Sequence, residues 1–160
     1  MSIQTKLITL ITIAVVALSC SSDKSSSDKL REKYNVKKEP TSLAEAEANW
    51  KDYKGVGPIT SITIPVEIDA ELAATGQEIF EAKCTACHKT EKRFIGPSPK
   101  GIMERRNPEW VMNMILNPDE MVQKDLLAKQ LLIEFNGSPM ANQNLKEEEA
   151  RAVLEYFRTL

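Results

Sequence analysis

Three closely spaced residues could hold an iron cofactor: Cys84, Cys87 and His88 form a Cys-x-x-Cys-His run. This spacing is the attachment signature of covalent c-type haem. Two thiols so spaced can add to the two vinyl groups on one edge of a porphyrin, and the adjacent histidine then places its imidazole beneath the iron. The run therefore predicts one haem c per chain, covalently attached at both cysteines, with His88 as an axial iron ligand.

Two other chemistries use the same residue types. A redox-active dithiol needs a strand-to-helix setting, whereas Cys84 and Cys87 end a predicted amphipathic helix. A structural zinc ion needs four ligands, and with one histidine and no other cysteine after Cys20, two of them would be carboxylates. Both readings are disfavoured against haem.

The sixth iron ligand must come from another residue type, because His88 is the only histidine of the chain. Bis-histidine ligation and a second conventional c-type haem are therefore excluded within one chain. Methionine is the soft ligand of choice for haem iron. Met140 lies in the polar loop Gly137–Asn142 before the final predicted helix, where it can cover the opposite haem face. The other methionines after Cys20 lie on predicted helices, where methionine usually fills core space, or close behind the haem motif: Met112, Met114 and Met121 in the first case and Met103 in the second. We expect Met140 on the iron; an open sixth position would instead imply gas binding or peroxidase-type chemistry.

The elements that must position these residues are helical. Apolar periodicity predicts helices at Asp69–Lys89, Asn107–Leu116, Pro118–Phe135 and Leu145–Leu160, with no strand partner. Asn107 and Asn117 are expected to cap the helices that begin at the prolines after them, and Asn144 is expected to cap the last helix in a capping box with Glu147.

The N-terminus has the pattern of an export signal. Lys6 precedes an apolar run from Leu7 to Leu18, which is too short to cross a bilayer, and Ser19 and Cys20 follow it. The end of this run resembles the lipobox of bacterial lipoproteins, although Ala17 stands where leucine is usual. We expect residues 1–19 to be a signal peptide and Cys20 to be lipidated; the alternative is cleavage by an ordinary signal peptidase.

A polar stretch separates this signal from the predicted domain. Ser21–Lys54 is rich in Ser, Lys, Asp, Glu and Ala, which is typical of a flexible tether, and Gly55–Ile68 is expected to run extended along the domain surface. We assign residues 20–67 to a lipidated tether and lead-in, and residues 68–160 to the folded domain. Leu43–Lys54 is expected to be solvated, with a transient helix as the alternative and no role for Trp50 or Tyr53.

From about Ile68 to Leu160 the sequence resembles the cytochrome c superfamily, whose small bacterial members pair Cys-x-x-Cys-His with a later Pro-Met loop and a closing helix. The resemblance implies an all-α fold of about four helices around one covalent haem. It also implies that Gly76 and Phe80 on the first helix pack against Tyr156 or Phe157 on the last.

Gly96-Pro97 stands where the family has a Gly-Pro that supplies a carbonyl to the proximal imidazole. The resemblance therefore implies that Pro97 accepts the second ring proton of His88 and belongs to the cofactor site. The chain departs from the family at Pro99 and Lys146, where leucine and a small hydroxyl residue are common; neither position is a ligand.

These features indicate an electron carrier, not an enzyme, since acid-base groups and an open coordination site are lacking. Expected partners are redox proteins. The expected donor is a quinol-oxidising complex, and the expected acceptor is a terminal oxidase or an anaerobic reductase. Nitrous oxide reductase is suggested as that reductase because Arg105–Pro118 resembles the same region of small envelope cytochromes. A net charge of −2 disfavours nucleic acid, and no small-molecule substrate is expected. The protein is expected to lie in the envelope of a Gram-negative-type bacterium, lipid-anchored and facing the periplasm or cell surface.

Basic residues gather around the haem motif. Between residues 83 and 106 only Glu91 and Glu104 are acidic, and the basic residues are Lys83, Lys89, Lys92, Arg93, Lys100, Arg105 and Arg106. They form either a collar that steers acidic partners toward the haem edge or an ordinary solvated surface.

Overall fold

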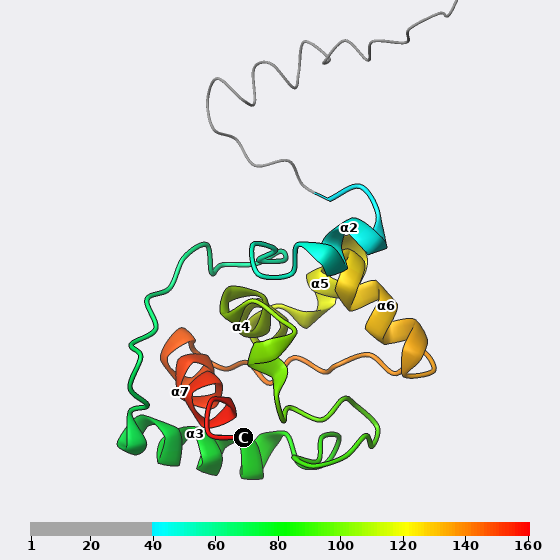
Figure 1. Cartoon of the computed structure of the whole chain (residues 1–160). Coiled ribbons are helices and arrows are strands. Elements are labelled where there is room, and N and C mark those ends of the chain that lie inside the picture. Colours follow the sequence, from blue (N-terminus) through cyan, green and yellow to red (C-terminus); the bar gives the residue numbers. More distant parts are fainter. Residues whose placement is uncertain (1–39) are drawn as a thin grey trace, which may run out of the picture. The chain divides into compact units, whose positions relative to one another are not determined.

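A computed structural model describes residues 40–160, which contain helices and no strand (Figure 1). The elements are α2 (Leu43–Ala48), α3 (Ala70–Lys83), the short 3-10 helix η1 (Ile102–Glu104), α4 (Pro108–Leu116), α5 (Pro118–Lys124), α6 (Leu126–Glu134) and α7 (Glu147–Phe157). The prediction of an all-α fold is confirmed. All the described residues fall within one compact unit. The predicted signal peptide, Cys20 and the first part of the tether lie outside the described residues.

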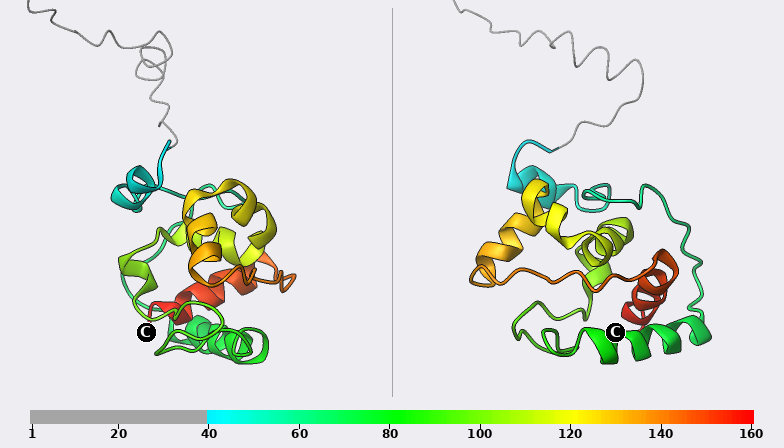
Figure 2. Two further views of the ribbon diagram at one scale, coloured as in Figure 1. Left: turned by 90° about the vertical axis from the view of Figure 1, so that its right-hand side faces the viewer. Right: turned by 180° about the vertical axis from the view of Figure 1, so that it is seen from behind.

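Helices α3 and α7 cross at very short range, and both views of Figure 2 show them side by side. A Cβ atom on Gly76 would lie 1.9 Å from the carbonyl oxygen of Ala152, so only glycine permits this approach. One turn further along α3, the ring centroid of Phe80 lies 5.6 Å from those of both Tyr156 and Phe157. The packing implied by the family resemblance is therefore present, and it uses both candidate aromatics.

Two of the predicted helix starts lie where expected. The Asn107 side chain accepts a hydrogen bond of 2.9 Å from the Glu109 amide, and Pro108 occupies the first turn of α4. Asn117 precedes α5, but its side-chain amide donates to the Glu120 carboxylate at 2.6 Å instead of capping an amide.

The predicted cap of the last helix is wrong. Helix α7 begins two residues later than expected, with Lys146 as its N-cap, and the Lys146 amide donates to the Glu149 carboxylate at 2.8 Å. Asn144 instead adopts a positive φ of 51° and turns the chain before the helix. Asparagine is one of the few residues that tolerates this conformation, which explains why the same residue type misled the sequence pattern.

The segment expected as one helix over Pro118–Phe135 is two helices, because Asp125 interrupts it. Asp125 has extended backbone angles, and its buried carboxylate accepts from the Ala128 amide at 2.7 Å and from the Trp110 indole at 3.1 Å. The aspartate therefore ends α5 and caps α6, and it also anchors Trp110 of α4.

The expectation that Leu43–Lys54 is solvated is wrong. Its first half forms α2, which packs against α6 and buries Ala46 completely. Its second half turns back onto the domain, where the Tyr53 hydroxyl accepts a hydrogen bond of 3.4 Å from the Leu126 amide. Packing thus begins well before Ile68, where we placed the start of the domain, and one of the two aromatics has a structural role.

Residues 51–62, here called the strap, contain a turn and several bends, and side chains of α4 hold them. The Asn113 side chain accepts from the Ile59 amide at 2.9 Å and donates to the carbonyls of Ile59 and Lys54 at 2.9 and 3.0 Å. The Glu109 carboxylate pairs with the Lys54 ammonium at 3.0 Å. Because the strap has no neighbouring strand in the described chain, these α4 side chains satisfy backbone groups that a sheet would otherwise pair.

A fully buried carboxylate, that of Glu155, ties α7 to the start of α3. It accepts from Arg151 at 2.6 Å, from Arg158 at 2.5 Å and from the Asp69 amide at 2.9 Å. Arg158 also donates to the Pro65 carbonyl at 2.7 Å. Burial acts to raise the pKa of Glu155, but the hydrogen bonds from Arg158, the Asp69 amide and Arg151 outweigh it, so the net pKa lies below its usual value.

Replacing this carboxylate should cost stability in a pH-dependent way. Because the folded-state pKa is depressed, the stabilisation is complete above the ordinary carboxyl range and is lost as pH falls through the folded-state value. We expect Glu155→Gln to lower the free energy of unfolding by about 3 kcal/mol at neutral pH. The difference from the unmodified protein should shrink below about pH 4. Denaturant titrations across pH test this, with the exposed Glu148→Gln as control; a pH-independent difference would contradict it.

Candidate haem site

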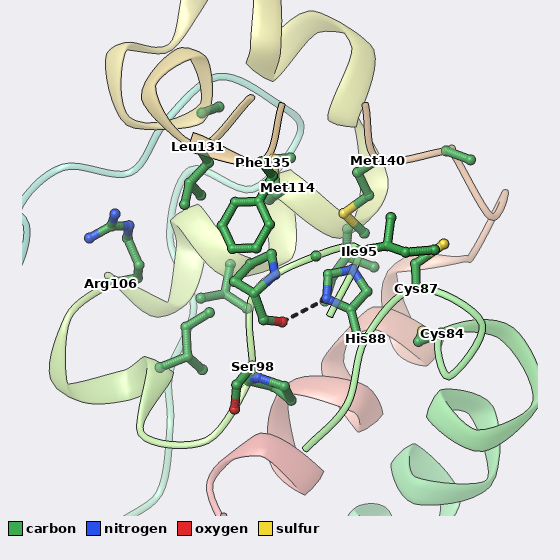
Figure 3. Close-up of a pocket in the computed structure, with 18 of the residues that line it drawn as sticks. Cys84, Cys87, His88, Ile95, Ser98, Arg106, Met114, Leu131, Phe135 and Met140 are labelled. Atoms are coloured by element: carbon green, nitrogen blue, oxygen red, sulfur yellow. Dashed lines mark hydrogen bonds between the residues drawn. The ribbon is translucent and has the colours of Figure 1, made fainter. Parts of the chain in front are cut away.

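The Cys-x-x-Cys-His run forms a tight turn at the end of α3. Cys84 is the C-cap of the helix, its amide donating to the Phe80 carbonyl at 2.8 Å, and its own carbonyl accepts from the amides of Cys87 at 3.0 Å and His88 at 2.8 Å. These bonds fold the three residues together, and all of them line one cavity (Figure 3). The α3–α7 crossing fixes where the turn lies, because Phe80 in the last turn of α3 is held by the aromatics of α7.

The imidazole of His88 is held from behind by the Gly96-Pro97 backbone. His88 Nδ1 lies 2.8 Å from the Pro97 carbonyl oxygen, as the dashed line in Figure 3 marks. Since a carbonyl only accepts, Nδ1 carries the proton and Nε2 presents its lone pair. A Cβ on Gly96 would lie 2.5 to 3.0 Å from three ring atoms, so glycine is required for this contact. The Gly96 amide donates to the Cys87 carbonyl at 2.9 Å and completes the support.

The cavity has an internal volume of about 210 Å³ and a largely apolar lining drawn from α3, α4, α6, α7 and the loops between them. Two methionines line it, Met140 and Met114. Figure 3 shows the side chain of Met140 directed into the pocket toward the imidazole of His88. Met112 and Met121 are buried in the core away from the cavity lining, and the Met121 sulfur accepts from the Val56 amide of the strap.

The alternative chemistries of the two cysteines find no support in the described residues. Burial is the main cause that raises the pKa of Cys84, helped by Cys87 and opposed by Lys83, whereas a redox-active dithiol needs a depressed pKa. The two thiols are not joined in a disulfide. No group of three or more His, Cys, Asp or Glu side chains in residues 40–160 could hold a metal ion. Two unpaired thiols, one oriented imidazole and two thioethers around an apolar cavity fit a covalently attached haem.

Comparison with known families decides the identity of this arrangement. Residues 73–160, from the first turn of α3 to Leu160, match the family model for cytochrome c. The chain belongs to the cytochrome c family. Its membership implies covalently bound haem c, one per chain, and a role in electron transport, and it confirms the resemblance read from the haem motif and the Pro-Met loop.

Solved structures of bacterial cytochromes c share the fold. Cytochrome c from Rhodothermus marinus is 44% identical, with a TM-score of 0.62 over 64% of this chain and 88% of that one. An engineered form of that protein, Rma TDE, is 43% identical with a TM-score of 0.62, covering 64% of this chain and 89% of its own. The same engineered cytochrome bound to a carbene intermediate is 43% identical with a TM-score of 0.60, covering 64% and 88%. A search of curated proteins finds no match.

Several residues that line the cavity were not singled out from the sequence. Arg105 and Arg106 were counted only as charges, yet both line the pocket, and the Arg106 guanidinium lies 5.3 Å from the Trp110 ring centroid. Burial lowers the pKa of both arginines. Phe135 had been placed at the end of a predicted helix, and it lines the pocket as well. The adjacent Arg-Arg pair was the one available signal, because paired cations beside an apolar cavity suit a cofactor with carboxylates.

Adding one methyl group behind the imidazole should disturb the site. Gly96→Ala places a Cβ within 3.0 Å of the His88 ring, which must rotate away from Pro97. We expect a lower yield of protein with covalently attached haem and an altered visible spectrum, measured by intact mass and absorbance after expression with haem-maturation machinery. Lys92→Ala, an exposed change in the same loop, should match the unmodified protein. A Gly96→Ala protein with unchanged yield and spectrum would show that the close contact is not required.

Proposed function

We propose that this cytochrome is a one-electron carrier whose haem is attached at Cys84 and Cys87 and ligated by His88 and Met140. When bound, haem c supplies an iron centre that cycles between two oxidation states. The observation that supports the proposal best is the shared cavity, which receives both thiols, an imidazole oriented by Pro97 and the Met140 thioether. Side chains from both faces would keep the coordination unchanged between redox states, which favours rapid transfer.

The proposal favours electron transfer over a haem enzyme or gas sensor because a soft side chain, that of Met140, lines the cavity and could fill the sixth position. Met140 lines the cavity from a loop, and its packing against the core makes it half-buried. Of the remaining lining residues, none is a second histidine, since the chain has one. General acid-base catalysis on a bound substrate would therefore lack its usual group.

The location and partners are also part of this proposal. We infer export through the leader of residues 1–19 and lipid anchoring at Cys20, supported by the signal-like sequence pattern. No helix within residues 40–160 is long and apolar enough to cross a bilayer. The proposed donors are quinol-oxidising complexes, and the proposed acceptors are a terminal oxidase or a reductase such as nitrous oxide reductase.

The Met140 ligand can be tested by absorption spectroscopy. A methionine sulfur on ferric haem gives a weak band near the red end of the visible range. Met140→Ala should abolish that band and let the reduced protein bind carbon monoxide, which the unmodified protein should bind poorly. Met114→Ala is the matched control, because Met114 also lines the cavity but lies on α4. Loss of the band in Met114→Ala with retention in Met140→Ala would move the ligand to α4.

Four of the seven basic residues around the haem motif fall into two groups, and the other three donate to main-chain carbonyls: Lys89, Arg105 and Arg106. Arg93 and Lys100 pair with Glu134 and Glu91 at 2.8 and 2.5 Å, so part of their charge is neutralised. A second group, Lys83 and Lys92, is exposed and forms no ion pair with a described residue. The proposed steering collar is therefore smaller than the sequence count suggested.

Steering by this group predicts a charge-specific salt effect. The rate of oxidation of the reduced protein by anionic ferricyanide should fall as ionic strength rises, because screening weakens attraction to the lysines. Replacing Lys83 and Lys92 together by Gln should flatten the dependence, whereas Lys51→Gln on the strap should leave it unchanged. Stopped-flow measurements over a salt series decide this; equal slopes for all three proteins would contradict a role for the lysines.

A further inference from the structure

One arginine joins two segments that line the pocket. Arg93 donates to the Glu134 carboxylate at 2.8 Å and, with a second N–H, to the Glu134 carbonyl. Its guanidinium carbon also lies 3.9 Å from the ring centroid of Phe135. The side chain thus makes an ion pair, a main-chain hydrogen bond and a cation–π contact on two consecutive residues.

Each of the two segments that Arg93 joins leads to a different proposed iron ligand, one to His88 and the other to Met140. Arg93 immediately precedes the turn whose Pro97 carbonyl orients His88. Glu134 ends α6, and Phe135 begins the loop that leads to Met140. In Figure 3, Phe135 and Met140 lie above the imidazole of His88, and Ile95 lies between Met140 and that imidazole.

The loop to Met140 is exposed along much of its course and is tied to α6 only at its start, where three main-chain amides donate to carbonyls at the end of that helix, at 3.1, 2.7 and 3.1 Å. Residues 136–139 are exposed, Asn136 and Gly137 have positive φ values of 58° and 73°, and a Cβ on Gly137 would meet nothing within 4 Å. Beyond Met140, the Asn142 side chain donates to the Leu116 carbonyl at 3.4 Å. The position of the thioether therefore depends in part on how firmly the first end of the loop is held, where Arg93 adds side-chain contacts to the main-chain bonds.

We propose that Arg93 is a clamp that holds the Met140 loop against the His88 side of the pocket and so limits replacement of Met140 by an external ligand. The inference rests on the proposed Met140 ligation and adds a positioning residue to it. Arginine suits the task because its planar fork reaches a carboxylate and a carbonyl at once while its face lies on an aromatic ring, which a lysine ammonium cannot do.

The size of the effect follows from the exposure of the pair. The Arg93 and Glu134 side chains are 51% and 47% exposed, so the ion pair alone contributes little. Together with the ring contact, loss of the clamp should raise the population of the open loop roughly three- to tenfold. A change of that size is large enough to raise the affinity for an external ligand but too small to unfold the protein.

The test is imidazole binding to the oxidised holoprotein, followed by absorbance. Arg93→Ala should bind imidazole roughly three- to tenfold more tightly than the unmodified protein. Arg93→Lys should lie in between, Glu134→Gln should give a partial increase, and Lys92→Ala, the neighbouring exposed cation, should give none. Denaturant unfolding of each variant should show changes too small to account for the increase.

A second background separates the clamp from the ligand assignment. In Met140→Ala, which lacks the competing thioether, Arg93→Ala should leave imidazole affinity unchanged. An equal increase in that background, or identical binding by Arg93→Ala and Lys92→Ala, overturns the clamp. If Met140→Ala retains the red band, the proposed function fails instead, and it does so independently of any Arg93 result. If Arg93→Ala loses its haem, the imidazole affinities of Arg93→Lys and Glu134→Gln are compared with that of the unmodified protein instead.

Discussion

The close crossing of α3 and α7 is the constraint on which the rest of the structure depends. At Gly76 the two backbones approach within a distance that excludes any side chain, and the aromatic cluster around Phe80 fills the space beyond. Because Cys84 caps the same helix, the crossing also decides where the haem-attachment turn begins. The buried Glu155 fixes the other end of α3, where it binds the Asp69 amide. Because the Glu155 carboxylate is buried, leaving it without its hydrogen-bond partners would cost much stability.

The two sides of the haem pocket are built by different physical means. The His88 side depends on backbone groups: the Pro97 carbonyl holds one ring nitrogen, and Gly96 allows the main chain to approach the ring. The Met140 side depends on side chains and an exposed loop. On the proposed ligation, this contrast keeps the imidazole fixed and makes the thioether the ligand that exchanges.

The strap shows how a segment of weak hydrophobic pattern can still be ordered. Asn113 makes three hydrogen bonds to its backbone, and Met121 accepts one more from Val56. The strap packs on α4 and α5, and Trp110 of α4 lines the pocket, so the packing of the strap reaches the pocket through one indole. The Asp125 carboxylate accepts a hydrogen bond from that indole.

The haem chemistry and the helical class follow from sequence alone, because they depend on local patterns: the spacing of Cys84, Cys87 and His88, the absence of a second histidine, and a proline-marked helix start such as that of α4. The tertiary structure decided what depends on distant partners. Whether residues 40–54 pack could not be predicted, since their bonding partners lie on helices many residues away. The break at Asp125 arises from an indole on another helix, and the role of Arg93 arises from Glu134, 41 positions along the chain. Local propensity contains no information about such contacts, because only the folded chain brings the groups within bonding distance.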